Sequence, residues 1–410
     1  MTQLRAAWLA VGVGAVAFVV LAWLLIPWHP YPGGPLTLPD ERDVFAAADL
    51  HRMLGYSSAA RWISRSSLVV SLVVTCVLGL TPLGRRAAAR LPGPWVVRVV
   101  LAVAAMTLVG WVVTVPFGVA QHRLDLRYDL SRQPWGAWVS DQAIGLAVSV
   151  VTTALGVLAL LGCVRLAGRW WPLVAGLLAA VLVVVGSFVY PVVVEPLFNS
   201  FTPLPQGPLR TQVLELASRE GVRVDDVLVA DASRRTTTLN AYVTGFGSTR
   251  RVVLYDNLVH TGDRAEILTV VGHELAHAKH DDVLNGTVIG AAGALAGIGV
   301  LGVLLGAVAR RSREDWYAGP AGVPLLLALF AVASVVTLPV ENTMSRQVET
   351  RADVDGLRAT RDLGAFVALQ TDLAVRGLSD PSPQAWSQIW FGSHPTALQR
   401  IAVGHRILGH

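Results

Sequence analysis

Two histidines and a glutamate stand close together in the segment Val271-Gly272-His273-Glu274-Leu275-Ala276-His277. On a helix, residues four positions apart lie on the same face, so the imidazoles of His273 and His277 can reach one cation. Glu274 projects beside them, where its carboxylate can take a proton from an attacking water. The spacing therefore predicts a catalytic zinc site. The alternative is that two histidines recur by chance and merely cap or pack.

A catalytic zinc needs a third protein ligand, and Glu349 is the best candidate downstream. It lies in a helix-compatible segment, 342–353, that starts where the last apolar run ends. Asp353 stands four residues later and hence on the same face, where a carboxylate can accept the outer N–H of a zinc-bound histidine. The opposing interpretation pairs these two acids with Arg346 and Arg351 on a solvated helix. The histidine pair upstream favours the ligand role.

Three more polar residues follow the histidine pair directly. His280 shares a helix face with His273, but it lies one turn beyond His277 and would draw the metal away from His273. We therefore rank His280 second as a ligand and expect it at the rim of the site. Asp281 and Asp282 are expected to cap or solvate the end of this helix at the membrane boundary.

The composition indicates that these residues belong to a membrane protein. Of 410 residues, 53% are hydrophobic and 15% are charged, and the mean hydropathy is +0.53. Such a chain is too apolar for an ordinary soluble protein. The net charge of +5 arises from arginine clusters beside apolar segments, which are typical of topology signals, so we expect no nucleic-acid partner. Cys76 and Cys163 lie inside apolar segments, where neither a disulfide nor a catalytic thiol is expected.

Seven apolar runs are candidates for membrane spans, each of which needs about 20 residues. The first follows Arg5 and is interpreted as a retained transmembrane helix, because it exceeds the apolar part of a signal peptide. The second is short, and a polar loop, 29–65, that could carry one amphipathic helix precedes it. The runs are 6–27, 68–83, 95–119, 143–166, 173–194, 284–309 and 323–340.

Between the fifth and sixth runs the chain changes character, because charged and hydroxyl residues alternate with short apolar stretches. This part is predicted to fold outside the bilayer as a helix, three strands and the helix of the zinc motif, for which Thr261-Gly262-Asp263 supplies the N-cap. The helix is 209–219, the strands are 222–230, 239–244 and 250–255, the turn of the hairpin is Gly245-Phe246-Gly247-Ser248, and the zinc-motif helix is 265–280.

The predicted fold is mainly α, that of a polytopic membrane protein with about seven transmembrane helices and an inserted α+β zincin-like metalloprotease domain. Residues 1–194 carry the first five spans, and residues 195–283 form the inserted zinc protease domain. Residues 284–340 carry the last two spans, and residues 341–410 form a helical C-terminal part that completes the protease site.

With these residues assembled, the chain resembles the type I CAAX prenyl endopeptidases, which are integral-membrane zinc metallopeptidases. It is more distantly similar to the bacterial heat-shock membrane metalloproteases. Motifs carry the resemblance over residues 195–410, and hydropathy alone carries it over the first 190 residues. The motifs are Pro196-Leu197-Phe198-Asn199, Phe201-Thr202-Pro203-Leu204, Asn240-Ala241-Tyr242, Val253-Leu254-Tyr255-Asp256-Asn257-Leu258, Asn342 with Ser345-Arg346, Glu349 and Ala352-Asp353, and Ser393-His394-Pro395 with Arg400.

The resemblance has implications for the fold and for further site residues. It implies that the helices enclose a large water-filled chamber, which the zinc domain closes at one end. It also implies that Asn240, Ala241 and Tyr242 form an edge strand that holds substrate. His394 and Arg400 would reach back into the active site as catalytic residues, with His394 near the substrate or its oxyanion. Without the resemblance, His394 would be assigned to a helix N-cap and Arg400 to the surface.

Together these residues predict zinc-dependent hydrolysis of a peptide bond. His273, His277 and Glu349 would bind Zn²⁺ and Glu274 would act as the general base. The expected partners are the lipid bilayer and a peptide or membrane-protein substrate, with or without a lipid. Two alternatives stay open: a quality-control protease of the heat-shock type, and a non-catalytic transporter or scaffold with a structural metal. Intramembrane charges would favour a transporter, yet the site-like residues lie outside the apolar runs.

The expected location is the bacterial cell membrane. Lys279 is the single lysine among 33 basic residues, which is typical of a GC-rich genome. Two signals disagree on the side that the protease domain faces. Arginines at 85, 86, 90, 165, 169, 310, 311 and 313 flank loops opposite the inserted domain, so the positive-inside rule puts that domain outside the cytoplasm, whereas the resemblance implies the cytosol. Cysteine-accessibility labelling at Ser233 distinguishes the two.

Overall fold

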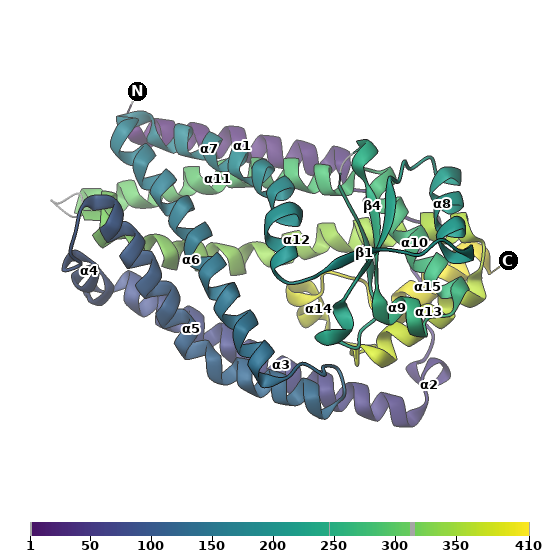
Figure 1. Ribbon diagram of the computed structural model, residues 1–410. Helices are drawn as coiled ribbons and strands as arrows, with labels where there is room; N and C mark the ends of the chain where they lie inside the picture. The colour runs from purple at the N-terminus through teal and green to yellow at the C-terminus, as the bar shows by residue number, and fades with distance from the viewer. Residues whose placement is uncertain (1, 246, 312–315, 410) are drawn as a thin grey trace.

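Seven helices of the protein are long and apolar enough to cross a membrane. The computed structural model describes residues 2–245, 247–311 and 316–409, and the count refers to this part of the chain. The predicted number of spans is confirmed (Figure 1). The seven helices are α1 (Gln3–Leu25), α3 (Ala47–Leu80), α5 (Trp95–Arg127), α6 (Trp135–Leu166), α7 (Trp171–Val189), α11 (Asp282–Arg311) and α12 (Val323–Thr360).

Helix α3 begins much earlier than its apolar run. The polar segment 29–65, in which the sequence indicates at most one separate helix, is already helical from Ala47, and this helix continues without a break into the span. Residues 47–80 contain no proline that would break a helix. The serine- and arginine-containing residues before the apolar run therefore join the same helix, which extends beyond the span on its polar side. The short helix α2 (Glu41–Val44) lies between α1 and α3. After α3, Thr81 caps the helix α4 (Pro82–Ala89) by accepting a hydrogen bond from the Leu83 N–H.

Helix α12 joins the last membrane span to the segment that carries Glu349. It runs for 38 residues without a break, although Pro339 lies inside it. The predicted boundary between residues 340 and 341 therefore falls within one helix. Helix-favouring polar residues follow the proline, so the α conformation continues after the single lost hydrogen bond.

The membrane helices contact one another in a circular order (Figure 1). Helix α1 packs on α11 and α11 on α7, and the order continues through α6, α5 and α3 to α12. Few of their side chains are buried: the buried share of the most apolar window ranges from 0% in Gly168–Leu197 to 33% in α11. A solid bundle would bury one face of each helix. The low burial supports an open ring, while the water-filled chamber stays a prediction.

The arginine-rich connections lie at the end of the ring opposite the sheet, where Figure 1 shows α4. There Arg85 stacks on Trp316 at 5.0 Å and Arg165 on Trp95 at 4.6 Å. Arg313, which belongs to the same predicted charge pattern, lies outside the described residues.

A four-stranded sheet forms the centre of the inserted domain. Its order is β1-β2-β4-β3, with β3 antiparallel to β4 and β2 parallel to β4. The predicted hairpin is confirmed and β3 lies at the sheet edge, whereas β1 is too short for the sequence pattern to reveal. Phe246 in the hairpin turn lies outside the described residues. The strands are β1 (Phe201–Pro203), β2 (Asp226–Ala230), β3 (Ala241–Thr244) and β4 (Arg251–Tyr255).

Five helices complete this end of the molecule with α10 (Arg264–Lys279), the helix of the zinc motif. Residues Leu216, Leu254 and Leu275 are fully buried in one core, and Leu369 from the C-terminal part joins them. The C-terminal helices therefore fold onto the inserted domain. The five helices are α8 (Pro208–Arg219), α9 (Asp256–Thr261), α13 (Leu363–Arg376), α14 (Ala385–Phe391) and α15 (Ala397–Leu408).

Candidate active site

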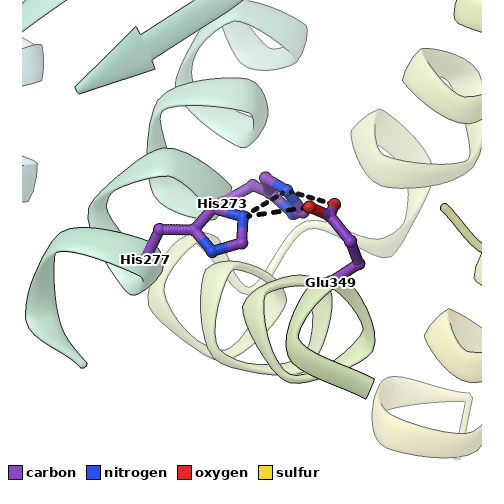
Figure 2. A group of neighbouring side chains, drawn as sticks. All are labelled: His273, His277 and Glu349. Carbon is purple, nitrogen blue, oxygen red and sulfur yellow. Dashed lines mark hydrogen bonds and ion pairs between the residues drawn. The ribbon is translucent and has the colours of Figure 1, made fainter. Parts of the chain in front are cut away.

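Helix α10 presents its histidines to α12. The predicted N-cap is confirmed, because the Asp263 side chain accepts a hydrogen bond from the Ala265 N–H. Val271 and Leu275 are fully buried in the core of the inserted domain, which fixes the rotation of the helix about its axis. The opposite face, with His273 and His277, is thereby turned toward α12 (Figure 2).

The three predicted metal ligands converge. The Nε2 atoms of His273 and His277 are 3.1 Å apart, and the Glu349 carboxylate lies 3.3 Å from the first and 3.7 Å from the second. One ligand atom from each residue falls within 4.8 Å of the others. Figure 2 shows the two rings and the carboxylate directed at one point.

This geometry fits a metal ion. Each histidine has its Nδ1 against a carboxylate, which holds the N–H there and leaves a lone pair on Nε2. Two lone pairs and a carboxylate so close together repel one another unless a cation lies between them. The Oε2 atom of Glu349 is also buried and accepts no hydrogen bond. Two imidazoles and a carboxylate form a donor set that Zn²⁺ commonly takes.

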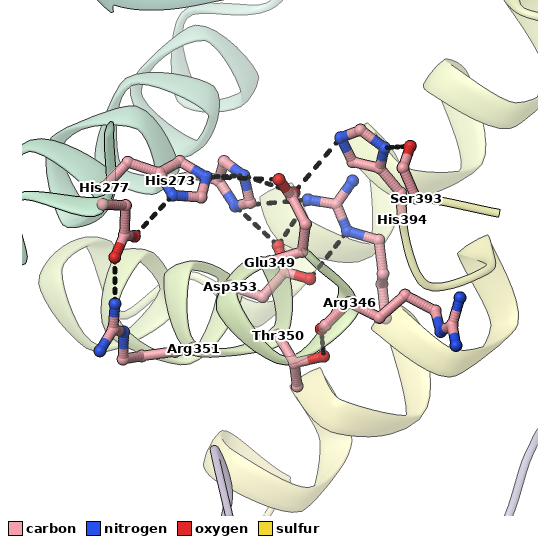
Figure 3. A network of polar contacts seen from close by, with 11 residues as sticks. His273, His277, Arg346, Glu349, Thr350, Arg351, Asp353, Ser393 and His394 are labelled. Atoms are coloured by element: carbon pink, nitrogen blue, oxygen red, sulfur yellow. Dashed lines mark hydrogen bonds and ion pairs between the residues drawn. The ribbon is translucent and has the colours of Figure 1, made fainter. Parts of the chain in front are cut away.

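Asp353 holds the outer nitrogen of His273. Its Oδ1 lies 2.9 Å from His273 Nδ1, and the Asp353 side chain is only 1% exposed (Figure 3). Burial alone would lower the pKa of His273, but the hydrogen bond to Asp353 and the nearby Glu349 carboxylate raise it to about 10. The site thus attracts positive charge strongly, which a metal ion can supply in place of the proton.

Arg400 reaches the site through Asp353. Its Nε donates to Asp353 Oδ2 at 2.8 Å and a terminal nitrogen to Oδ1 at 2.5 Å. The same terminal nitrogen lies 3.4 Å from His273 Nδ1, on the side away from Glu349. This places Arg400 behind His273, where it can orient Asp353; its catalytic role stays a prediction.

Asp282 holds the outer nitrogen of His277. Its Oδ2 lies 2.9 Å from His277 Nδ1, and Arg351 donates to its Oδ1. The expectation that Asp282 merely caps or solvates the helix end is therefore wrong, because the turn at Asp281 directs this carboxylate to His277 and leaves it only 9% exposed. Asp281 instead pairs with Arg250 at 2.5 Å, at the surface.

The two arginines considered as partners of Glu349 and Asp353 bind elsewhere. Arg351 pairs with Asp282, and Arg346 donates to the backbone carbonyls of Gln388 and Gly392 at 2.9 and 2.6 Å. His280 pairs with Asp355 at 2.7 Å, away from the ligand cluster.

His394 stands at the open side of the cluster. Its Nε2 lies 3.4 Å from Glu349 Oε2, its Nδ1 lies 3.0 Å from Ser393 Oγ, and its side chain is 61% exposed (Figure 3). Asn342 on α12 holds the preceding helix by donating to the Trp390 carbonyl at 2.6 Å. Together with Arg346, this clamp gives a structural reason for the Asn342 and Arg346 positions of the motif.

Glu274 lies beside the histidines without being a ligand in this arrangement. Burial raises the pKa of its carboxyl above the ordinary value, while His273 and His277 pull it down. A carboxylate that is buried next to a cation site and gains a proton more easily than usual suits a general base.

The predicted substrate strand lies at the sheet edge and packs beside α10. The carbonyl of Asn240 accepts a hydrogen bond from the Tyr255 N–H at 3.0 Å, and Ala241 pairs with Leu254 on β4. The phenol of Tyr242 donates to Glu195, and burial together with this carboxylate raises the pKa of Tyr242. The Tyr242 side chain is thus tied to the end of the fifth span, and the strand backbone is what could meet a substrate.

The fold and the site together define the class as a membrane metallopeptidase of the glutamate type. The features that define it are a helix with His-Glu-x-x-His, a glutamate from a later helix and a ring of membrane spans. The chain belongs to peptidase family M48. Residues 203–405 match the family described as "Peptidase family M48", and residues 38–200 match "CAAX prenyl protease N-terminal, five membrane helices". The predicted family and enzyme class are confirmed, and the transporter or scaffold alternative falls away.

Relatives and a solved structure agree with this assignment. The chain is 35% identical over 304 residues to the uncharacterized metalloprotease YhfN of Bacillus subtilis, which covers 72% of this chain and 70% of that protein. It is 28% identical over 294 residues to a CAAX prenyl protease 1 homolog of Oryza sativa subsp. japonica, covering 68% and 66% of the two chains. The fold resembles the crystal structure of S. mikatae Ste24p, with a TM-score of 0.77 and 20% sequence identity. The superposition covers 97% of this chain and 99% of that chain.

Proposed function

We propose that this membrane metalloprotease is a zinc-dependent endopeptidase in which His273, His277 and Glu349 bind the metal. The observation that carries the proposal is the convergence of three lone-pair donors, two of which are imidazoles whose outer nitrogens are already held by Asp353 and Asp282. Magnesium and calcium prefer sites made of oxygen ligands alone, so the two imidazoles favour zinc.

Zinc held by these residues would polarise the scissile carbonyl and make water more acidic. The chain's own residues perform the proton transfers. The Glu274 carboxylate takes a proton from the water as its oxygen bonds to the carbonyl carbon. The same carboxyl then gives that proton to the amine nitrogen as the C–N bond breaks. A raised pKa of Glu274 helps this shuttle, because the group must act first as a base and then as an acid.

Two groups around Glu274 would orient the substrate. The outer edge of β3, with Ala241 and Tyr242 and with Asn240 just before the strand, can add an extended peptide through main-chain hydrogen bonds. His394 stands on the open side next to Glu349, where its ring can stabilise charge that develops on the carbonyl oxygen. Main-chain binding tolerates many sequences, so specificity must arise from features beyond the cleaved bond.

The substrate should arrive at the membrane boundary. Glu349 lies on the same helix as the seventh span, and Asp282 is the first residue of the sixth. We propose a membrane-associated peptide as substrate. A prenylated C-terminus is supported by the name of the rice relative, a CAAX prenyl protease 1 homolog. General clearance of membrane peptides is supported by the arginine-rich, lysine-poor composition, which is typical of a GC-rich bacterial genome. The Bacillus relative likewise supports the bacterial cell membrane as the location.

Purified protein in detergent or nanodiscs tests this function. Chelator treatment should abolish cleavage, and stoichiometric zinc should restore it. A prenylated CAAX peptide and an unlipidated membrane peptide of the same sequence should then be compared in one assay. Preference for the first assigns a lipid-directed protease, and equal cleavage assigns general clearance. Cleavage that persists in metal-free protein would contradict the proposal.

A further inference from the structure

We propose that Asp282, held by Arg351, is a positioning residue for the metal ligand His277. Through this pair, the membrane helices α11 and α12 both take part in building the metal centre. The inference rests on the proposed ligand role of His277.

The contact between His277 and Asp282 fixes the state of the ring. Asp282 Oδ2 lies 2.9 Å from His277 Nδ1, which keeps the proton on Nδ1 and the lone pair on Nε2. The Nε2 atom is the one that faces His273 and Glu349, at 3.1 and 3.7 Å. Loss of the carboxylate would let the ring rotate or change tautomer, and the metal would lose a prepared ligand.

The turn between α10 and α11 delivers Asp282 to this position. Helix α10 ends at Lys279, and Asp281 adopts the left-handed region with φ of 53°. An aspartate tolerates this conformation better than most residues, and it changes the direction of the chain so that α11 can start at Asp282. The side chain of Asn285 donates to the His280 carbonyl at 2.8 Å and so clamps the turn.

Burial separates Asp282 from an ordinary acid at a helix end. The Asp282 side chain is 9% exposed, whereas that of its neighbour Asp281 is 47% exposed. A buried carboxylate is stable only when it is paired and hydrogen-bonded. Asp282 meets that condition through His277 on one oxygen and Arg351 on the other.

Arg351 ties this contact to the helix of the third ligand. It lies on α12 two residues after Glu349, and Figure 3 shows it below His277. Its guanidinium donates to Asp282 Oδ1, while its buried Nε has no hydrogen-bond partner among the described residues. The ion pair with Asp282 is therefore the main polar contact of this largely buried cation. Any shift of α12 or α11 relative to α10 would disturb the orientation of His277.

The two histidines are supported in the same way from different helices. His273 is held by Asp353, which Arg400 grips with two hydrogen bonds. His277 is held by Asp282, which Arg351 grips in turn. Each imidazole thus has a carboxylate whose charge and direction are set by an arginine, as expected where charge-assisted hydrogen bonds fix a ligand.

Zinc affinity tests the inference directly. Asp282→Ala and Asp282→Asn are compared with the matched control Asp281→Asn, which alters the adjacent acid and keeps a residue that tolerates positive φ. Competition with a chromophoric chelator gives the zinc affinity, and the visible spectrum of the cobalt-loaded protein reports ligand geometry. Losing a carboxylate behind a metal-bound histidine typically weakens metal affinity about 10- to 100-fold.

We expect a loss of that size for Asp282→Ala, with a changed cobalt spectrum. Asp282→Asn should lose less, because its amide oxygen can still accept the Nδ1 proton, and it retains the shape of the side chain if the alanine variant fails to fold. Asp281→Asn should bind zinc as the wild type does. Wild-type zinc affinity and an unchanged cobalt spectrum in both Asp282 variants would overturn this inference but leave the proposed function intact. A wild-type protein without stoichiometric zinc would overturn the proposed function as well.

Discussion

Gly356 on α12 lies directly against the backbone of His273 on α10. A Cβ atom at position 356 would stand 2.7 Å from the His273 backbone nitrogen, and one on Gly272 would stand 3.2 Å from the Gly356 carbonyl oxygen. The two helices therefore touch backbone to backbone beside the ligand cluster. This close approach is what lets Glu349 on α12 reach both histidines on α10.

Gly356→Ala should separate the two helices. The added methyl meets backbone atoms that cannot move aside, and overpacking of this kind costs about 1–3 kcal/mol in unfolding free energy. Glu349 should withdraw from the histidines and zinc affinity should fall, as chelator competition would show. Gly286→Ala on α11 is the matched control, because a Cβ there meets nothing within 4 Å. Equal zinc affinity in the two variants would show that the contact is not limiting.

Arg400→Lys should act through Asp353. Lysine keeps the charge but cannot make the two parallel hydrogen bonds to the carboxylate. Disrupting one partner of a buried ion pair can lower the unfolding free energy by about 3–5 kcal/mol. The cost of the lysine substitution should lie at the low end of this range, because lysine keeps part of the attraction to Asp353. The unfolding temperature and the zinc affinity should both fall, while KM should change little. A large rise in KM with unchanged zinc affinity would instead place Arg400 on the substrate.

His394→Ala should slow the reaction without removing the metal. The ring is exposed and touches the cluster only at Glu349, so stability and zinc content should match the wild type. Removing one group that stabilises an oxyanion typically lowers kcat about 100-fold or more. Arg346→Ala should cause a smaller loss of kcat, because it removes the hydrogen bonds to the Gln388 and Gly392 carbonyls that hold the segment before His394. Loss of zinc from the His394 variant would indicate a ligand role.

The acid side of the pH profile should report Glu274. Only the deprotonated carboxylate can accept a proton, so kcat/KM must fall as the pH falls through the pKa of Glu274. Because burial raises that pKa, the fall should begin above the ordinary glutamate value of about 4.3. Zinc content must be measured at each pH, since protonation of ligands also releases metal. Full activity down to the ordinary glutamate range, with zinc bound, would contradict the general-base assignment.

The spans and the candidate ligands could be predicted because they follow simple patterns, apolar run length for the first and helical spacing for the second. Seven apolar runs, of which only the second is short, mark the membrane helices, and His273 with His277 and Glu349 with Asp353 each stand at helical spacing. Both signals are local, so they survive without knowledge of tertiary contacts.

The sequence could not reveal features that depend on how helices meet. The polar start of α3 resembles a loop in hydropathy, although nothing in residues 47–65 breaks a helix except one glycine. Asp282 resembles any acid at a helix end until the left-handed turn at Asp281 directs it to His277. Its position next to a second aspartate carried no signal that one is buried and the other exposed.

Zinc analysis combined with peptide cleavage by the Glu274→Gln variant tests the central claim most directly. The amide keeps the size of the side chain but cannot accept the proton, so zinc should stay bound at one ion per chain while kcat falls about 100- to 10,000-fold. The unfolding temperature should not decrease, because the buried carboxylate is replaced by a neutral group. Full peptidase activity of the zinc-loaded variant would contradict the assignment of Glu274 as the proton shuttle, and with it the mechanism.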